Sequence, residues 1–536
     1  MRFADHLTIA PIVLPLVAGA LLLLFEERRH TLKALINIAA TLLLVILCQG
    51  LLRKADGGAQ ASIYLLGNWP APFGIVLVLD RLSALMLAMT SLLALAALVF
   101  ALARWHKAGS HFHTLFQFLL MGLNGAFLTG DLFNLFVFFE VFLAASYGLM
   151  LHGSGSGRTR AGLHYIAVNL AASFLFLIGV SLIYGVTGTL NMADLAVRIV
   201  GVPAESRALL EAGIAILGIA FLVKAGMWPL CFWLPGAYAA AVAPVAAIFA
   251  VLSKVGVYAV LRLSPLILGT GGGASAGLAD NWLFIGGAAT IAFGMIGVLA
   301  SQVMARLTGF SVLVSSGTLL AAAGMADASV TAGALFYMVS STLTIGALFL
   351  LVELVERAQD PAAGVLAVTM EAYGDDDEEE IEDEVGVAIP GTLAALGLCF
   401  GLSGILLAGL PPLSGFLGKF ALLSAALGTG GREGVPVTAW IFLALVLTSG
   451  LFAMIAMMRA GIRIFWAPVG GTVPKVLVVE FVPVAFLIML CAAMTVQAGP
   501  LMRYADDAAR SLHAPAGYIG DVLSAARVAP PEGGKP

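Results

Sequence analysis

Long apolar segments recur from one end of this 536-residue chain to the other, and they constrain its fold more than any other feature. A run of about 20 apolar residues is long enough to cross a bilayer as a helix, whereas a transmembrane barrel shows shorter segments of alternating polarity. Hydrophobic residues make up 61% of the chain and charged residues 11%, against about 45–50% and about 25% in soluble domains. The sequence therefore predicts an all-α, polytopic membrane protein.

Hydropathy predicts about fourteen membrane-spanning helices, one of them broken. They are expected near residues 7–25, 32–52, 76–103, 114–130, 131–151, 162–186, 207–234, 240–262, 281–301, 305–325, 330–355, 389–428 (broken), 436–465 and 476–498. An even number of spans puts both termini on the same side of the membrane. The distribution of lysine and arginine over the loops favours the side outside the cytoplasm.

Two adjacent apolar segments within residues 221–262 carry one lysine each, Lys224 and Lys254, and no carboxylate. An ionisable side chain at the bilayer centre costs about 2.5–3.5 kcal/mol on insertion scales, and it normally faces a bundle interior or a water-filled cavity. Pro229 and Pro235 follow Lys224 and interrupt the helix, because proline lacks a backbone donor and clashes with the carbonyl one turn back. A lysine beside a broken helix indicates part of an ion or proton path.

Two further ionisable residues, Glu140 and Lys419, lie deep in apolar segments. Lys419 follows 412-PLSGFL-417, which resembles 229-PLCFWL-234 at the first break. Paired broken helices in two halves of a chain are typical of inverted repeats with sites near the membrane midplane. One carboxylate and three amines favour a proton relay over a sodium cage, which needs several converging oxygens. The alternative is that each charge is a buried partner that fixes helix register.

Other polar residues give weaker indications. Asp131 is a secondary site candidate that could equally cap the fifth span. Ser316, Ser340 and Ser341 can hold water or bond across helices. A histidine group could bind a metal, but without nearby cysteine or aspartate its members are expected to be surface residues at headgroup level. These histidines are His106, His111 and His113.

Several classes of function receive no support. The four cysteines lie far apart in apolar runs, as buried thiols rather than metal ligands or disulfides. There is no phosphate-binding loop, no dinucleotide fingerprint and no nucleophile with its base, so we expect no cofactor, no metal and no covalent chemistry. The net charge of −4, without a basic cluster, gives no reason to expect a nucleic-acid partner.

Two polar segments stand apart from the apolar runs. The acidic run 375-DDDEEEIEDE-384 reads as a solvated loop kept open by charge repulsion, or alternatively as a cation-attracting vestibule or partner contact. The tail over residues 503–536 is polar and ends in PPEGGKP, which predicts a frayed terminus.

Three long segments resemble a known family. Residues 115–151, 224–259 and 409–420 are similar to the antiporter-like subunits of respiratory complex I and of Mrp-type Na⁺/H⁺ antiporters. The resemblance covers about residues 5–500. The turn GAYAAAVAP favours the Mrp branch, because complex I relatives usually have an Asp-Ala-His-containing turn there.

The resemblance implies fourteen transmembrane helices with two inverted five-helix repeats that contain broken helices. The implied organisation is an N-terminal part, 1–106; a first repeat, 107–265; a second repeat, 280–466, with an acidic loop at 356–388; and a last helix with a polar tail, 467–536.

The resemblance also implies roles for the four charges. Glu140 would pair with Lys224, while Lys254 and Lys419 would continue a hydrated axis. Relatives often have a histidine in the eleventh span, where this chain has serines; Ser340 or Ser341 would then hold a water wire.

The function implied is that of a proton-translocating membrane subunit of a hetero-oligomeric monovalent cation (Na⁺)/H⁺ antiporter in the cell membrane. Its partners would be other antiporter subunits, the bilayer, and H⁺ and Na⁺ as transported ions. The alternative is a proton-pumping subunit of a complex I-like NADH dehydrogenase or membrane-bound hydrogenase. A self-sufficient transporter is a third possibility, and the cost of four buried charges disfavours a scaffold.

Overall fold

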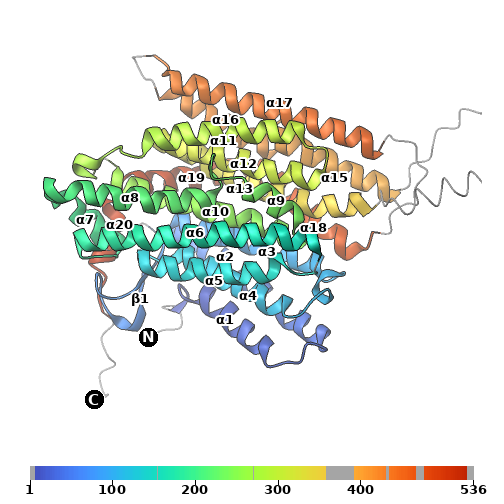
Figure 1. Ribbon diagram of the computed structural model, residues 1–536, viewed down its shortest axis with the longest axis horizontal. Helices are drawn as coiled ribbons and strands as arrows, with labels where there is room; N and C mark the ends of the chain where they lie inside the picture. The colour runs from blue at the N-terminus through green and yellow to red at the C-terminus, as the bar shows by residue number, and fades with distance from the viewer. Residues whose placement is uncertain are drawn as a thin grey trace, which may run out of the picture.

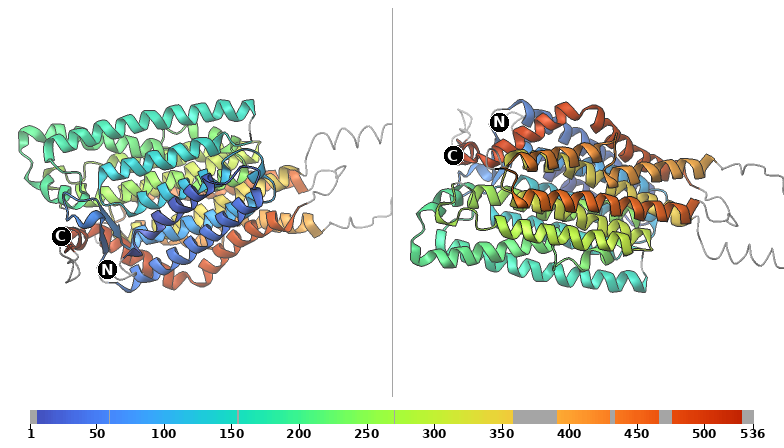
Figure 2. Two further views of the ribbon diagram at one scale, coloured as in Figure 1. Left: turned by 90° about the horizontal axis from the view of Figure 1, so that it is seen from below. Right: turned by 90° about the horizontal axis from the view of Figure 1, so that it is seen from above.

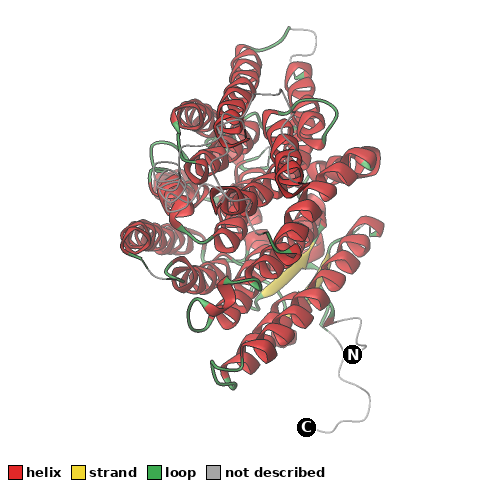
Figure 3. Ribbon diagram, turned by 90° about the vertical axis from the view of Figure 1, so that its right-hand side faces the viewer, coloured by secondary structure: helices red, strands yellow, loops and turns green. Residues whose placement is uncertain are grey.

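The computed structural model describes residues 6–58, 60–153, 155–269, 271–357, 391–429, 434–465 and 476–527. Its helices lie side by side in one bundle along the long axis of the molecule (Figure 1), and most are seen end-on in a view down that axis (Figure 3). The acidic segment 375–384 lies outside the described residues, so both interpretations of it remain predictions.

Each of the fourteen predicted spans corresponds to described helices. The N-terminal spans are α1 (Ala10–Leu23), α2 (His30–Gly57) and α3 (Arg81–Ala101). The next are α4 (Phe112–Leu128), α5 (Leu132–Met150), α6 (Ser156–Thr187), α8 (Ala204–Ala225) with α9 (Trp233–Ala240), and α10 (Ala243–Leu268). They are followed by α11 (Asp280–Ala300), α12 (Met304–Gly324), α13 (Ala328–Glu356), α15 (Gly391–Ala408) with α16 (Ser414–Gly428), α17 (Val437–Phe465) and α18 (Val478–Val496). A short helix, α7 (Met192–Arg198), precedes α8. Twelve of the described helices are long and apolar enough to cross a membrane, which confirms the predicted class.

Both predicted helix breaks are present, and they are built alike. The chain leaves α8 through Gly226 and leaves α15 through Gly409, each with φ of 76°. This left-handed backbone conformation suits glycine because it has no Cβ. The two breaks leave the last carbonyls of α8 and α15 without the next helical turn, so these groups can accept hydrogen bonds from elsewhere.

The packing of the two proposed repeats is similar. In the first, α4 packs against α5 and α6 against α8; in the second, α11 packs against α12 and α13 against α16. The same pattern of helix pairs thus recurs in both proposed repeats, and their boundaries stay a prediction. The contact between α11 and α12 is especially close: a Cβ added at Gly317 would lie 2.8 Å from the backbone nitrogen of Ile291. Small residues that let backbones approach are typical of helix pairs in membranes.

A two-stranded hairpin, which the sequence did not suggest, precedes α3. Strand β1 (Ser62–Leu65) pairs antiparallel with β2 (Val76–Leu79), Ser62 opposite Leu79. The helix expected from residue 76 therefore begins only at Arg81. Apolar residues dominate β2 as they do α3, so hydropathy could not separate them.

The prediction of a frayed tail was wrong over residues 503–523. This part belongs to α19 (Ala498–His513) and α20 (Ala516–Leu523), and α19 packs against α13. Its buried residues include Tyr504, Ala508 and Leu512, spaced four apart on one helical face. The polar composition of the segment concealed this apolar face.

The hairpin is a meeting point for both ends of the described chain. His6 Nδ1 lies 3.0 Å from the Tyr64 hydroxyl, and the Ala61 backbone donates to Asp521 Oδ2 at 2.8 Å. The two ends of the described chain thus lie at the same end of the bundle, as an even number of spans predicts (Figure 2).

Two expectations about other residues have opposite outcomes. All four cysteines are buried and free, as predicted. The expectation that the histidines are surface residues was wrong for His106 and His113, whose side chains are buried. Asn37 Nδ2 lies 2.8 Å from His113 Nδ1, and His113 Nε2 lies 3.3 Å from His106 Nδ1. Within the described residues no group of three or more histidine, cysteine or acidic residues is arranged to hold a metal.

Candidate functional site

Glu140 and Lys224 are connected through a hydroxyl rather than by a direct ion pair. Ser173 of α6 donates a hydrogen bond to Glu140 Oε1, and Lys224 Nζ donates to Ser173 Oγ at 3.5 Å. Within the described residues the pairing implied by the family resemblance is therefore a bridged one. A hydroxyl can accept and donate at the same time, so Ser173 offers a path for a proton between the amine and the carboxylate.

Lys224 lies in the last turn of α8, directly before the first break. The C-terminal end of a helix carries a partial negative charge, which favours a cation there. The ammonium group also lies 5.1 Å from the centre of the Phe139 ring, a distance at which the ring face attracts a cation. The break thus provides part of the electrostatic compensation for a buried amine.

Lys254 lies in the middle of the unbroken helix α10 and is 0% exposed. Its Nζ donates to Ser316 Oγ of α12 at 3.2 Å. This contact brings together one predicted principal residue and one predicted secondary residue. A single neutral hydroxyl stabilises an ammonium group far less than a carboxylate would.

A group of hydroxyl side chains follows Ser316 toward the second break. Ser315 and Ser341 lie 2.9 Å apart between their Oγ atoms, and Ser340 and Ser414 lie 2.8 Å apart. Ser315, Ser340 and Ser341 line a cavity of about 20 Å³ that Lys419 also lines. This volume is enough for about one water molecule. The hydroxyl-bearing residues that line it are Ser311, Ser315, Tyr337, Ser340, Ser341, Thr344 and Ser449.

Lys419, in α16, is placed against the second break. Its Nζ donates to the carbonyl oxygens of Ala408 at 2.9 Å and Leu407 at 3.2 Å, at the C-terminal end of α15. Gly409 has no side chain, and a Cβ there would come within 3.1 Å of Lys419 Cε. The chain therefore places an ammonium group at the C-terminal end of a half-helix twice, at Lys224 and at Lys419.

The remaining secondary candidate, Asp131, has a local role. Its side chain accepts a hydrogen bond from the backbone of Asn134 at 2.8 Å and caps the N-terminus of α5. The alternative of a helix cap is confirmed.

Two hydroxyl residues that contact the predicted site residues were not identified from the sequence. Ser173 is a hydroxyl within the long apolar helix α6, and Ser414 is the first residue of α16. Neither has a charge or a motif of its own. The position of Ser414 within 412-PLSGFL-417 was the one available signal, because that motif marks the break.

The fold and these contacts define a class: a polytopic helical transport subunit with broken helices and a buried line of ionisable and hydroxyl side chains. The family described as NADH:quinone oxidoreductase/Mrp antiporter, transmembrane, matches residues 129–451. A protein of Rhizobium meliloti, named as the probable D-type subunit of a K(+)/H(+) antiporter, is 62% identical over 98% of both chains. The D-type subunit of the Na(+)/H(+) antiporter of Alkalihalophilus pseudofirmus is 33% identical over 97% of this chain and 99% of its own.

A solved structure agrees with these relatives. One chain in the structure of the Mrp complex from a Dietzia species has a TM-score of 0.80 and 26% identity, covering 98% of this chain and 100% of that one. This protein belongs to the NADH:quinone oxidoreductase/Mrp antiporter family, as a D-type subunit of an Mrp antiporter. It is a multi-pass membrane protein and a component of a multisubunit antiporter.

Proposed function

We propose that this chain carries protons for a multisubunit monovalent cation/proton antiporter in the cell membrane, along a relay formed by Glu140, Lys224, Lys254 and Lys419. The observation that carries the proposal is the series of contacts that these four residues make with Ser173, Ser316 and the hydroxyl-lined cavity. Buried amines next to hydroxyls and water can exchange protons, whereas isolated buried charges would only add cost.

The second part of the proposal concerns the exchanged cation. The relative from Alkalihalophilus pseudofirmus is named for sodium, and the 62% identical relative is named for potassium. The relay contains few converging oxygens for either ion. We therefore infer that protons pass through this chain and that the cation is sodium, or, as the second candidate, potassium.

The exposure of Glu140 supports a partner subunit beside α5. Glu140 is only half-buried, on a helix face whose neighbours Phe133 and Val137 are 51% and 41% exposed. A carboxylate in contact with lipid at this depth is costly, so a second membrane subunit covering this face relieves that cost. The other subunits of the antiporter are the partners that fit.

The proposed function is tested in everted membrane vesicles that contain the complete complex. A proton gradient is imposed, and its dissipation is followed with a pH-sensitive dye after addition of sodium or of potassium. Cation-dependent dissipation supports the proposal and identifies the cation. Co-purification of iron–sulfur and flavin proteins in place of small antiporter subunits would instead support the complex I-like alternative.

Replacing Ser173 by alanine is expected to slow exchange about 100-fold, the lower end of what a positioned proton-transfer group contributes. Threonine at the same position keeps the hydroxyl and should retain most of the activity. Initial rates of cation-dependent proton movement in vesicles with matched amounts of complex measure the effect. Equal rates for the alanine and threonine variants would show that the bridge carries no protons.

Ser341 provides a similar comparison for the hydroxyl-lined cavity. Threonine and valine have nearly the same shape, but only threonine has a hydroxyl. We expect Ser341→Val to lower the exchange rate by about tenfold or more, because it removes a partner of Ser315 and of any water in the cavity. Ser341→Thr should be close to wild type. If both variants lose activity equally, added volume and not the lost hydroxyl is responsible.

A further inference from the structure

Arg262 lies on the same face of α10 as Lys254. Positions 254, 258 and 262 are spaced four apart, so Lys254, Tyr258 and Arg262 follow one another along the helix. Arg262 is about 12 Å along the axis from Lys254. The Tyr258 side chain lies between them and donates its hydroxyl hydrogen to the backbone carbonyl of Phe127 at 2.7 Å.

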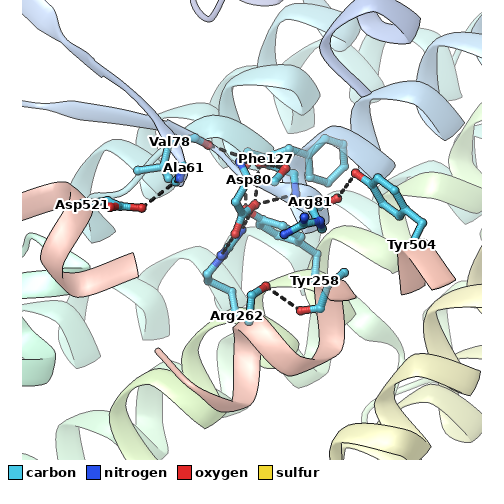
Figure 4. A network of polar contacts seen from close by, with 12 residues as sticks. Ala61, Val78, Asp80, Arg81, Phe127, Tyr258, Arg262, Tyr504 and Asp521 are labelled. Carbon is cyan, nitrogen blue, oxygen red and sulfur yellow. Dashed lines mark hydrogen bonds and ion pairs between the residues drawn. The ribbon is translucent and has the colours of Figure 1, made fainter. Parts of the chain in front are cut away.

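Arg262 takes part in a network of polar contacts (Figure 4). It forms a bidentate ion pair with Asp80, with Nη2 donating to Oδ1 at 2.7 Å and Nη1 to Oδ2. The guanidinium group lies 5.6 Å from the centre of the Tyr258 ring and 5.3 Å from that of Tyr518. Asp80 is fixed in turn, because it caps α3 and accepts hydrogen bonds from Ser83 N at 2.9 Å and Ser83 Oγ at 2.8 Å.

A cavity of about 100 Å³ lies next to this pair. Asp80, Arg81 and Arg262 line it together with the exposed residues Gln60 and Ser511. It is located where α2 ends and α3 begins, between the hairpin and the C-terminal helices. Helix ends with charged residues lie at the membrane surface, and the volume holds several water molecules. Water can therefore approach the C-terminal part of α10, as far as Arg262, from this side.

Neither member of the pair is suited to carry protons. Arginine keeps its proton at any physiological pH. Burial pushes the pKa of Asp80 upward, but the charge and the hydrogen bonds of Arg262 outweigh this effect and hold the pKa below its ordinary value. The other charged groups at the cavity are Arg81, which donates to the carbonyls of Asp56 and Gly58, and Asp521, bound to the Ala61 backbone.

We propose that Arg262, fixed by Asp80 and the two tyrosines, is an electrostatic seal that prevents protons from passing between Lys254 and the water-accessible cavity. The positive charge of Arg262 lies on α10 itself and repels a proton on its way to or from Lys254, as arginine does in pores that exclude protons. The negative charge of Asp80, at the N-cap of α3, offsets this repulsion in part. An antiporter needs such a barrier, because a proton that escapes from Lys254 into this cavity dissipates the gradient without moving a cation. The inference depends on the proposed relay through Lys254.

The test uses the complete complex in proteoliposomes, with a pH gradient imposed in a medium without sodium or potassium. The double variant Asp80→Asn with Arg262→Gln removes both charges, retains a capping residue for α3 and leaves no unpaired ion buried. We expect it to assemble and to leak protons about three times faster than wild type, less than the roughly tenfold effect of one unpaired charge at about 12 Å and an effective dielectric constant of about 20, because the charge of Asp80 offsets part of that of Arg262.

The control variant is Asp327→Asn. Asp327 caps α13 through Ser329 N at 2.8 Å and Val330 N at 3.0 Å, so this change replaces an aspartate cap away from Arg262 and should not leak. Adding Lys254→Ala to the double variant should stop the leak. A wild-type leak rate in the assembled double variant, or a leak that persists without Lys254, would overturn the proposal.

A charge-reversed pair covers the case in which the double variant fails to assemble. Asp80→Arg with Arg262→Asp keeps the ion pair but puts a negative charge on α10, so it should leak faster than wild type. An unchanged rate would contradict the seal. Lys254→Ala alone separates the two proposals: full antiport in that variant would refute the relay, whatever the leak measurements show.

Discussion

Replacement of Lys224 by methionine is expected to abolish cation/proton exchange in a complex that still assembles. Methionine fills the space of the lysine stem with an apolar chain. Removing the amine eliminates a charge that has a hydroxyl and an aromatic ring as neighbours, and it leaves Glu140 half-buried with Ser173 as its partner. The loss should be about 100-fold or more, as for other positioned proton-transfer groups.

Replacement of Lys224 by arginine distinguishes two roles of this lysine, a carrier of protons and a fixed positive charge. It keeps the positive charge next to Ser173 but does not release its proton. If Lys224 carries protons, Lys224→Arg should also be inactive. If Lys224 only fixes helix register through its positive charge, Lys224→Arg should retain exchange activity. The control is Lys54→Met, in the last turn of α2 and exposed. Rates are measured in everted vesicles after the amount of assembled complex has been determined. Full exchange by an assembled Lys224→Met variant would count decisively against the relay.

The sequence was sufficient for the class of fold and for the charged part of the candidate site. Fourteen apolar segments identify their helices because nothing else explains such runs in a chain with 11% charged residues. Pro229 and Pro412 indicate the two breaks because proline cannot continue a helix. Lys224, Lys254 and Lys419 are conspicuous because each is costly where it lies.

The hydroxyl residues that contact the charged ones could not be predicted from the sequence, for a physical reason. Ser173 and Ser414 are neutral and small, and a serine in an apolar helix changes neither its hydropathy nor its periodicity. Their importance arises only when α6 meets α8 and when α13 meets α16. The same applies to Arg262 and Asp80, which are 182 positions apart along the chain. Hydropathy treats each segment separately, so contacts between distant segments do not appear in it.

The glycine breaks connect fold and site in a way that the sequence only suggested. A lysine in an unbroken transmembrane helix finds its neighbouring carbonyls already occupied by helical hydrogen bonds. At Ala408 and Leu407 the break frees these carbonyls, and Lys419 donates to both. Lys254 lies in an unbroken helix and has one hydroxyl partner. Lys419 thus has two backbone acceptors and Lys254 one hydroxyl, so the steps of the proposed relay differ in the partners that they offer an ammonium group.

Replacement of Gly317 by leucine is expected to prevent the chain from accumulating in the membrane. Gly317 lies where α12 crosses α11, and a Cβ there would lie 2.8 Å from Ile291 N, 2.9 Å from Gly287 O and 2.9 Å from Thr290 Cβ. Two of these three atoms belong to the backbone, so no rotamer change can make room. Forcing a leucine into such a contact separates the helices and should cost more than about 3 kcal/mol, beyond the usual range for overpacked cores. Because α12 carries Ser315 and Ser316, the hydroxyl partners of the relay would be displaced with it.

Gly401 provides the matched control for this change. It lies in the interior of α15, is exposed, and has no atom within 4 Å of an added Cβ. Gly401→Leu is the same glycine-to-leucine substitution, and leucine has a higher helix propensity than glycine. The amount of full-length chain in the membrane fraction and its thermal unfolding in detergent measure both variants. We expect Gly401→Leu to match wild type and Gly317→Ala to fall between wild type and Gly317→Leu, because one methyl group displaces the helices less than four carbons do. Normal accumulation and thermal stability of Gly317→Leu would mean that α11 and α12 do not pack as closely as described, and the position assigned to Ser316 beside Lys254 would then be wrong as well.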